Sequence, residues 1–100
     1  MIGSDASGRV VGNSFAAQAR QALENIVAVL GEAGARPEHI VRMTWYVLDK
    51  KEYAAAYKEL GAVYREIMSD HYPAMTAVQV AALVDDSARL EIEVTAVIPE

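Results

Sequence analysis

The chain has 100 residues, of which 53% are hydrophobic and none is cysteine, and its formal net charge is −5. This length fits one domain, residues 1–100, and the lack of cysteine excludes disulfide scaffolds, thiolate nucleophiles and cysteine-ligated metals. No apolar run approaches the ~20 residues of a membrane span, and an acidic chain lacks the clustered positive charge that nucleic acids require, so we expect a cytoplasmic protein with neither partner.

The first forty residues predict a short strand followed by one long helix. Small residues over 3–8 predict tight turns after the chain start. Asn13 or Ser14 is placed to cap a helix, and Gly34 and Pro37 are placed to end it. The buried face of this helix is expected to carry apolar residues at helical spacing: Phe15, Ala19, Ala22, Leu23, Ile26 and Leu30.

The middle of the chain predicts a strand and a second helix. Residues 40–48 are rich in β-branched and aromatic side chains, which is typical of a strand. Asp49 and Glu52 match a capping box, in which each side chain satisfies a free backbone N–H at the helix start. The inward face of the strand is expected to carry Val41, Met43, Trp45 and Val47. The buried face of the helix is expected to carry Tyr53, Tyr57, Leu60, Tyr64 and Ile67 before Tyr72-Pro73 ends it.

Two further strands are expected at residues 75–83 and 89–98, joined by a loop at 84–88. The resulting order is strand, helix, strand, helix, strand, strand, which indicates an α+β two-layer sandwich with a mixed β-sheet. Crossover connections are right-handed, so two in succession place both helices on one face of the sheet.

The other face of the sheet is expected to be mixed in character, neither wholly apolar nor strongly charged. It is either solvated, as antiparallel sheets permit, or covered by another subunit, which the apolar surplus favours. The side chains expected on it are Arg42, Thr44, Tyr46, Met75, Ala77, Gln79, Ala81, Glu91 and Glu93.

Four segments, 18–26, 41–49, 73–83 and 91–97, together with Tyr64, carry a further pattern. In this order and spacing they resemble the first helix, the central strand and the C-terminal strand pair of the Rid (YjgF-type, reactive intermediate deaminase) family. The resemblance covers essentially the whole chain. It implies a chorismate-mutase-like sandwich that assembles as a homotrimer, with small-molecule clefts between subunits. It also implies strands before Met1, so the sheet is expected to be truncated at that end.

The resemblance further implies water-assisted hydrolysis of small enamines or imines to keto acids and ammonia, without a metal or organic cofactor. Glu91 matches the glutamate that orients or activates water in the family. Three matched positions depart from the family pattern. Met75 replaces an arginine that clamps the substrate carboxylate, Ala77 replaces a cysteine, and Gly61 replaces a ligand-positioning asparagine. We therefore expect a divergent member whose cleft suits a bulkier or neutral ligand.

The polar and charged residues expected on the open face each have a functional and a structural interpretation. Glu91 and Glu93 could serve acid–base chemistry, or they could simply solubilise this face or form salt bridges between subunits. Arg42 and Arg89 could anchor an anion in place of the missing arginine, or pair with these glutamates. Tyr46 could present its hydroxyl to the cleft or pack at an interface.

The apolar candidates also have two interpretations, and the histidines are not expected to bind a metal. Met75 and Ala77 could line the ligand cleft, or pack at a trimer seam. His39 and His71 lack metal-ligand spacing, so no metal site is expected.

Three functions stay open at this point. The first is a Rid-type imine hydrolase with Glu91 handling water. The second is a trimer that binds a small apolar or aromatic metabolite without turnover. The third, ribonuclease activity or translation inhibition, is disfavoured by the acidic charge and by the lack of a basic–aromatic stripe.

Overall fold

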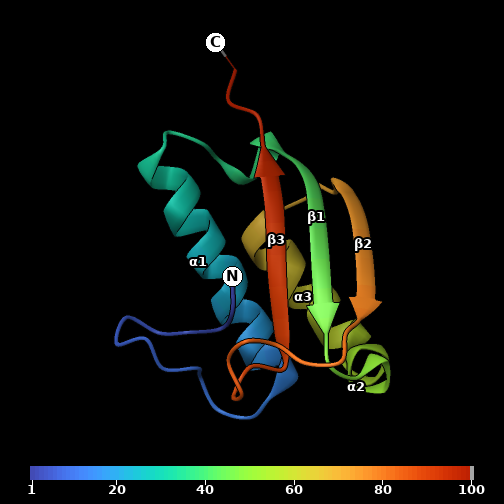
Figure 1. The fold of residues 1–100 in the computed structure, drawn as a ribbon. Coiled ribbons are helices and arrows are strands. Elements are labelled where there is room, and N and C mark those ends of the chain that lie inside the picture. The colour runs from blue at the N-terminus through green and yellow to red at the C-terminus, as the bar shows by residue number, and fades with distance from the viewer. Residues whose placement is uncertain (100) are drawn as a thin grey trace.

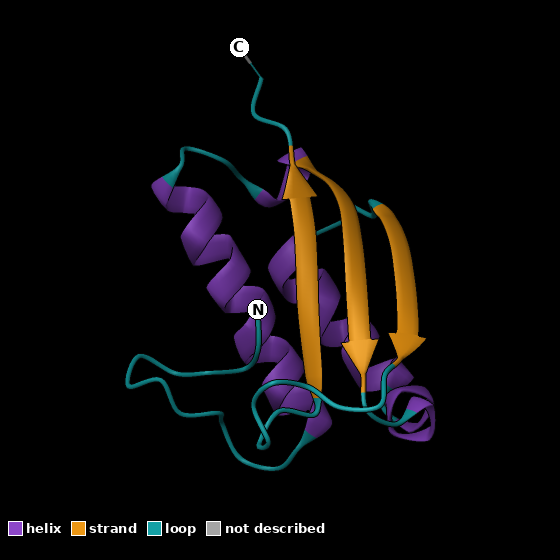
Figure 2. Ribbon diagram, viewed as in Figure 1, coloured by secondary structure: helices purple, strands orange, loops and turns teal. Residues whose placement is uncertain are grey.

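The computed structural model describes residues 1–99 and contains one three-stranded sheet, with strand order β2-β1-β3. The central strand β1 (Ile40–Val47) pairs in parallel with β2 (Ala74–Gln79) and antiparallel with β3 (Leu90–Ala96). Helices α1 (Phe15–Glu32) and α3 (Tyr57–Met68) lie together behind one face of the sheet (Figures 1 and 2). The short helix α2 (Lys50–Ala55) lies at one end of the sheet. The predicted α+β sandwich, with a mixed sheet and helices on one face, is confirmed.

Helix α1 follows its sequence pattern closely. The Ser14 hydroxyl caps it by accepting a hydrogen bond from the backbone N–H of Ala17 at 3.3 Å. Gly34 follows the helix end with a φ of +78°, a conformation that costs glycine little. The chain then reaches β1 through a single 3₁₀ turn at Pro37–His39.

The core lies between the helices and the covered face of the sheet. Since apolar side chains alternate along β1 and β3, each strand sends a row of them toward α1 and α3. The fully enclosed side chains of the core include Leu23, Ile40, Met43, Val47, Met68, Leu90 and Ile92.

No helix within residues 1–99 combines the length and the apolar character that crossing a bilayer requires.

The second helix differs from its prediction in two ways. It is divided at Ala56, whose ψ of 1° departs from helical geometry and separates α2 from α3. The capping box is only half formed. The Asp49 carboxylate accepts a hydrogen bond from the backbone N–H of Lys51 at 2.8 Å, as a cap should. Glu52 instead forms an ion pair with Arg89, at 2.9 Å.

The register of β2 reverses the predicted placement of its side chains. Residues at the same level of a parallel pair point to the same face. Met75 lies level with Met43, and Ala77 lies level with Trp45. Since Met43 and Trp45 are buried under the helices, Met75 and Ala77 lie on the helix side. The prediction that they share a face with Glu91 is wrong.

Strand β2 also ends earlier than predicted, at Gln79. Gln79 lies level with Val47, so its predicted place on the open face is wrong as well. Its side-chain oxygen accepts a hydrogen bond from the backbone N–H of Lys50 at 2.8 Å, at the start of α2. Ala81 lies beyond the strand. All six residues of β2 are exposed, so burial does little to fix which way they point.

A bulge at the start of β1 corrects one further residue. The pairing with β3 shifts between Ile40 and Arg42, which leaves Val41 as the extra residue. Val41 is 49% exposed, so its predicted place on the buried face is wrong.

The segment before α1 forms bridges rather than the short strand predicted there. Met1 exchanges two backbone hydrogen bonds with Ile92, at 2.6 and 2.8 Å, along the outer edge of β3. Ser4 and Val10 form an isolated antiparallel bridge. The Asn25 side chain ties this segment to α1 by donating to the carbonyl oxygen of Ser4 at 2.8 Å.

Candidate functional site

Glu91 lies on the open face of the sheet, directly opposite Tyr46 on the neighbouring strand. Its carboxylate borders a hollow of about 260 Å³, lined by Tyr46 and by residues of the segment 80–84 that follows β2. The amino group of Met1 lies 3.8 Å from a Glu91 carboxylate oxygen. Glu91 therefore combines partial exposure with a nearby concave surface, where a water molecule and a small ligand could meet it.

Glu93 lies two residues further along β3, on the same face. The Tyr46 hydroxyl donates a long hydrogen bond of 3.4 Å to its carboxylate. Both carboxylates and the tyrosine thus lie together, as the strand alternation predicts. Glu93 is the more exposed of the two acids and does not line the hollow that Glu91 shares with Tyr46. Both acids line a second hollow of about 270 Å³, between β3 and α1.

Met75 and Gly61 meet on the opposite side of the sheet. They line a pocket of about 290 Å³ between α3 and β2, together with Trp45 and several tyrosines. Ala77 is not among the residues that line it. Four of the predicted site residues therefore form two groups, Glu91 with Tyr46 and Met75 with Gly61, with the sheet between them.

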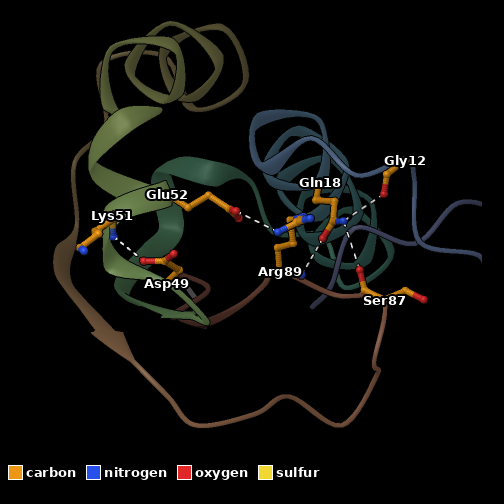
Figure 3. Close-up of polar contacts among 7 residues, drawn as sticks. All are labelled: Gly12, Gln18, Asp49, Lys51, Glu52, Ser87 and Arg89. Atoms are coloured by element: carbon orange, nitrogen blue, oxygen red, sulfur yellow. Dashed lines mark hydrogen bonds and ion pairs between the residues drawn. The ribbon is translucent and has the colours of Figure 1, made fainter.

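The two candidate arginines belong to neither group. Arg42 is exposed on β1, level with Thr95, and forms no ion pair within residues 1–99. Arg89 pairs with Glu52, so the prediction that it pairs with Glu91 or Glu93 is wrong (Figure 3). Neither arginine lines the hollow at Glu91 or the pocket at Met75.

A buried glutamine that was not among the predicted site residues fixes the approach to β3. The Gln18 amide nitrogen donates to the carbonyl oxygens of Gly12 and Ser87, at 3.1 and 3.2 Å. Its oxygen accepts the backbone N–H of Arg89 at 2.8 Å (Figure 3). These bonds tie α1 to the loop just before Glu91. The available signal was a polar residue on the apolar stripe of α1.

The junction between α3 and β2 is held by polar and aromatic contacts. The Tyr64 hydroxyl donates to the carbonyl oxygen of His71 at 2.8 Å, and burial raises the pKa of Tyr64 to about 12. Its ring stacks on Tyr72 with a centroid distance of 5.3 Å. The His71 ring bonds to the carbonyl oxygen of Ile40 at 2.7 Å. Within residues 1–99, no group of three acidic or histidine side chains could hold a metal ion.

The same architecture occurs in a solved structure. YyfA of Yersinia pestis, described as a protein of unknown function of the conserved Rid protein family, matches this structure with a TM-score of 0.83. The match is 31% identical in sequence and covers 98% of this chain and 75% of that one. The fold and site thus define an α+β sandwich of the Rid class, with an acidic open face and a separate aromatic pocket.

Sequence comparison gives the family. The model described as endoribonuclease L-PSP matches residues 1–98, and the chain belongs to this family, also called Rid or YjgF-type. A RutC family protein of Haemophilus influenzae is 41% identical over 81 residues, which are 81% of this chain and 62% of that protein.

A second relative carries an enzymatic name. A protein of Salmonella typhimurium named 2-iminobutanoate/2-iminopropanoate deaminase is 37% identical over 90 residues, covering 87% of this chain and 66% of its own length. The chain thus spans about two thirds of the length of these curated relatives, or slightly less.

Proposed function

We propose that this protein hydrolyses small imines or enamines to carbonyl compounds and ammonia, with Glu91 handling the water. The observation that carries the proposal is the place of Glu91, beside Tyr46 in a hollow of the open sheet face. The resemblance that places the family's water-handling glutamate at Glu91, and a relative named as an imine deaminase, support it.

The proposed step consumes only water and the imine. Glu91 accepts a hydrogen bond from water and takes its proton as the oxygen adds to the imine carbon. Glu91 returns this proton to the nitrogen. The added hydroxyl then loses its proton to Glu91 as the carbon–nitrogen bond breaks, which gives the carbonyl compound and ammonia. A positioned general base of this kind contributes a factor of roughly 10²–10⁴ in rate.

We place the ligand in a cleft between subunits of a homotrimer, because one chain does not bring the two groups of residues together. Glu91 lies on the open face, whereas Met75 and Gly61 lie on the helix side. The edge strand β2 is exposed along its whole length and carries the apolar side chains of Met75 and Val78. A second protomer packed against β2 would cover these side chains and let the two groups face one another.

Replacement of Glu91 tests the proposal. Imines made by an amino acid oxidase are trapped with semicarbazide, and their hydrolysis competes with trapping. We expect Glu91→Gln, which keeps the shape but removes the base, to lower the rate by about 100-fold or more. Glu93→Gln, two residues away on the same face, should leave the rate close to that of the wild type. Wild-type protein that gives no rate above buffer with any imine, or equal losses in both variants, would contradict the proposal.

The second candidate function is a trimer that binds a small apolar or aromatic metabolite without turnover. The aromatic pocket at Met75 favours it, because neutral residues stand where the family has an arginine and an asparagine. Thermal shift against a metabolite panel separates the two functions. Binding that survives Glu91→Ala and yields no product establishes the binding module.

A further inference from the structure

The pocket between α3 and β2 is built mainly from aromatic rings. Trp45 and Tyr64 are buried at its base, whereas Tyr57 and Tyr72 are 66% and 62% exposed along its walls. The rings of Trp45 and Tyr53 meet edge to face at 5.9 Å, and those of Tyr53 and Tyr57 meet at 6.0 Å. The exposed rings of Tyr57 and Tyr72 offer faces and edges to a further ring without displacing any core side chain.

Gly61 supplies room in this pocket. It lies inside α3, where glycine is the least favourable residue after proline, and its φ is not positive. The backbone therefore does not require glycine here. A Cβ atom built at this position meets no other atom within 4 Å. The missing side chain thus leaves open space at the pocket wall, which a bound molecule can occupy.

Arg65 lines the same pocket, one helical turn after Gly61. Arg20, Arg36 and Arg89 each pair with a glutamate. Arg65 makes no such pair through its side chain within residues 1–99. An unpaired guanidinium offers a fork of N–H donors that matches a carboxylate, and the match is strongest beside an apolar surface.

We propose that this pocket binds a planar aromatic ring that carries a carboxylate on a short chain. The ring lies against the tyrosines in the space left by Gly61, and the carboxylate bonds to Arg65. A volume of about 290 Å³ accommodates one ring and a short chain. The naming of a substrate rests on the proposed function: the substrate is an aryl 2-imino acid, which with water gives the aryl 2-keto acid and ammonia.

Fluorescence provides a direct binding test, because Trp45 is the only tryptophan of the chain and lines the pocket. Phenylacetate, which has both the ring and the carboxylate, is expected to change the emission in a saturable way. Phenylacetamide lacks the charge and propionate lacks the ring, so each should bind at least about tenfold more weakly. No saturable change with phenylacetate, or equal binding of all three, would overturn the proposal.

Two variants and a matched control locate the ligand. Arg65→Gln is expected to weaken phenylacetate binding about tenfold or more, whereas Arg9→Gln, an exposed arginine in the N-terminal loop, should bind as the wild type does. Gly61→Leu should abolish binding by filling the pocket. It should melt no lower than the wild type, because leucine favours a helix more than glycine does. Wild-type affinity in Arg65→Gln or in Gly61→Leu would overturn the proposal.

The imine assay separates this inference from the proposed function. If both hold, imines made from phenylalanine are hydrolysed in preference to those made from alanine. Hydrolysis without that preference and without phenylacetate binding overturns the aromatic ligand and keeps the enzyme. Phenylacetate binding without hydrolysis of any imine supports the pocket and overturns the enzyme.

Discussion

Gln18 is a buried polar side chain whose hydrogen-bonding groups are matched by backbone partners from two distant segments. Its amide bonds to Gly12, Ser87 and Arg89, which joins the start of α1 to the start of β3. Removing one partner of a buried hydrogen bond destabilises a protein by more than the bond contributes. The other partner then stays buried without a bond to either water or protein. Gln18 therefore stabilises the segment that leads into Glu91.

Gln18→Ala is expected to lower the free energy of unfolding by roughly 1–3 kcal/mol, since it removes three hydrogen bonds to partly buried backbone groups. Urea denaturation measures the loss. Gln21→Ala is the matched control. Among residues 1–99 the Gln21 side chain bonds only to Asn25 on the same helix, at 2.9 Å, so Gln21→Ala should cost less than about 1 kcal/mol. Similar losses in the two variants would contradict a clamp role for Gln18.

The capping box shows which contacts of a single residue can be predicted from the sequence. Asp49 caps α2 as predicted, because its partner Lys51 is a near neighbour in the chain. Glu52 was expected to bond to the nearby backbone at the helix start, but it forms an ion pair with Arg89, 37 residues away. Local motifs can be predicted when all partners are local. A charged partner from a distant strand start can be identified only from the fold.

At the scale of elements, α1, β1 and β3 were predictable because each buries one face. A regular apolar row leaves a single orientation that places it in the core. Strand β2 has no such row, since all its residues are exposed. Met75, Ala77 and Gln79 were therefore assigned to the wrong face. The same error joined two groups of candidate residues that the structure separates, because it placed Met75 beside Glu91.

The end of α3 gives an element-scale prediction at high pH. The pKa of Tyr64 is raised from 10.0 to about 12 by burial, then by Tyr72, so the folded state favours the neutral phenol. This contribution to stability is complete below pH 10 and is lost as the pH rises toward 12. We expect the unfolding free energy of the wild type to fall more steeply over this range than that of Tyr64→Phe.

Urea denaturation of both proteins between pH 8 and pH 12 measures this difference. At pH 8 the variant should be less stable by about 1 kcal/mol, because the hydrogen bond to His71 is missing. The gap should narrow as the pH approaches 12. Burial also raises the pKa of Tyr53, but this affects both proteins equally. A constant gap across the range would contradict the role assigned to Tyr64.

At the scale of the whole molecule, the family and the two-layer fold were predictable from four ordered segments, and the comparisons confirm both. The separation of the candidate site residues into two groups was not predictable in the same way. Glu91 and Met75 lie on opposite sides of one sheet. No pattern within a single chain states which surface of a neighbour completes a cleft.

We therefore predict that three copies of the chain associate in solution. Sedimentation equilibrium is expected to give three times the chain mass of 10.8 kDa. Val78 lies on the open face, level with Tyr46 and 41% exposed. Val78→Lys should dissociate the trimer by placing like charges at the interface. Val29→Lys, at an exposed position of α1, should leave the mass unchanged. A wild-type monomer, or dissociation by both variants, would contradict the trimer.

The edge strand β2 also affects how a single, dissociated chain should behave. Its six residues, Ala74–Gln79, include no charged side chain and no proline, although such residues commonly protect the outermost strands of sheets. Its outer backbone groups can therefore pair with any extended segment of another molecule. Assembly of the proposed trimer and aggregation thus compete for the same six residues, and conditions that dissociate such a trimer should also promote precipitation.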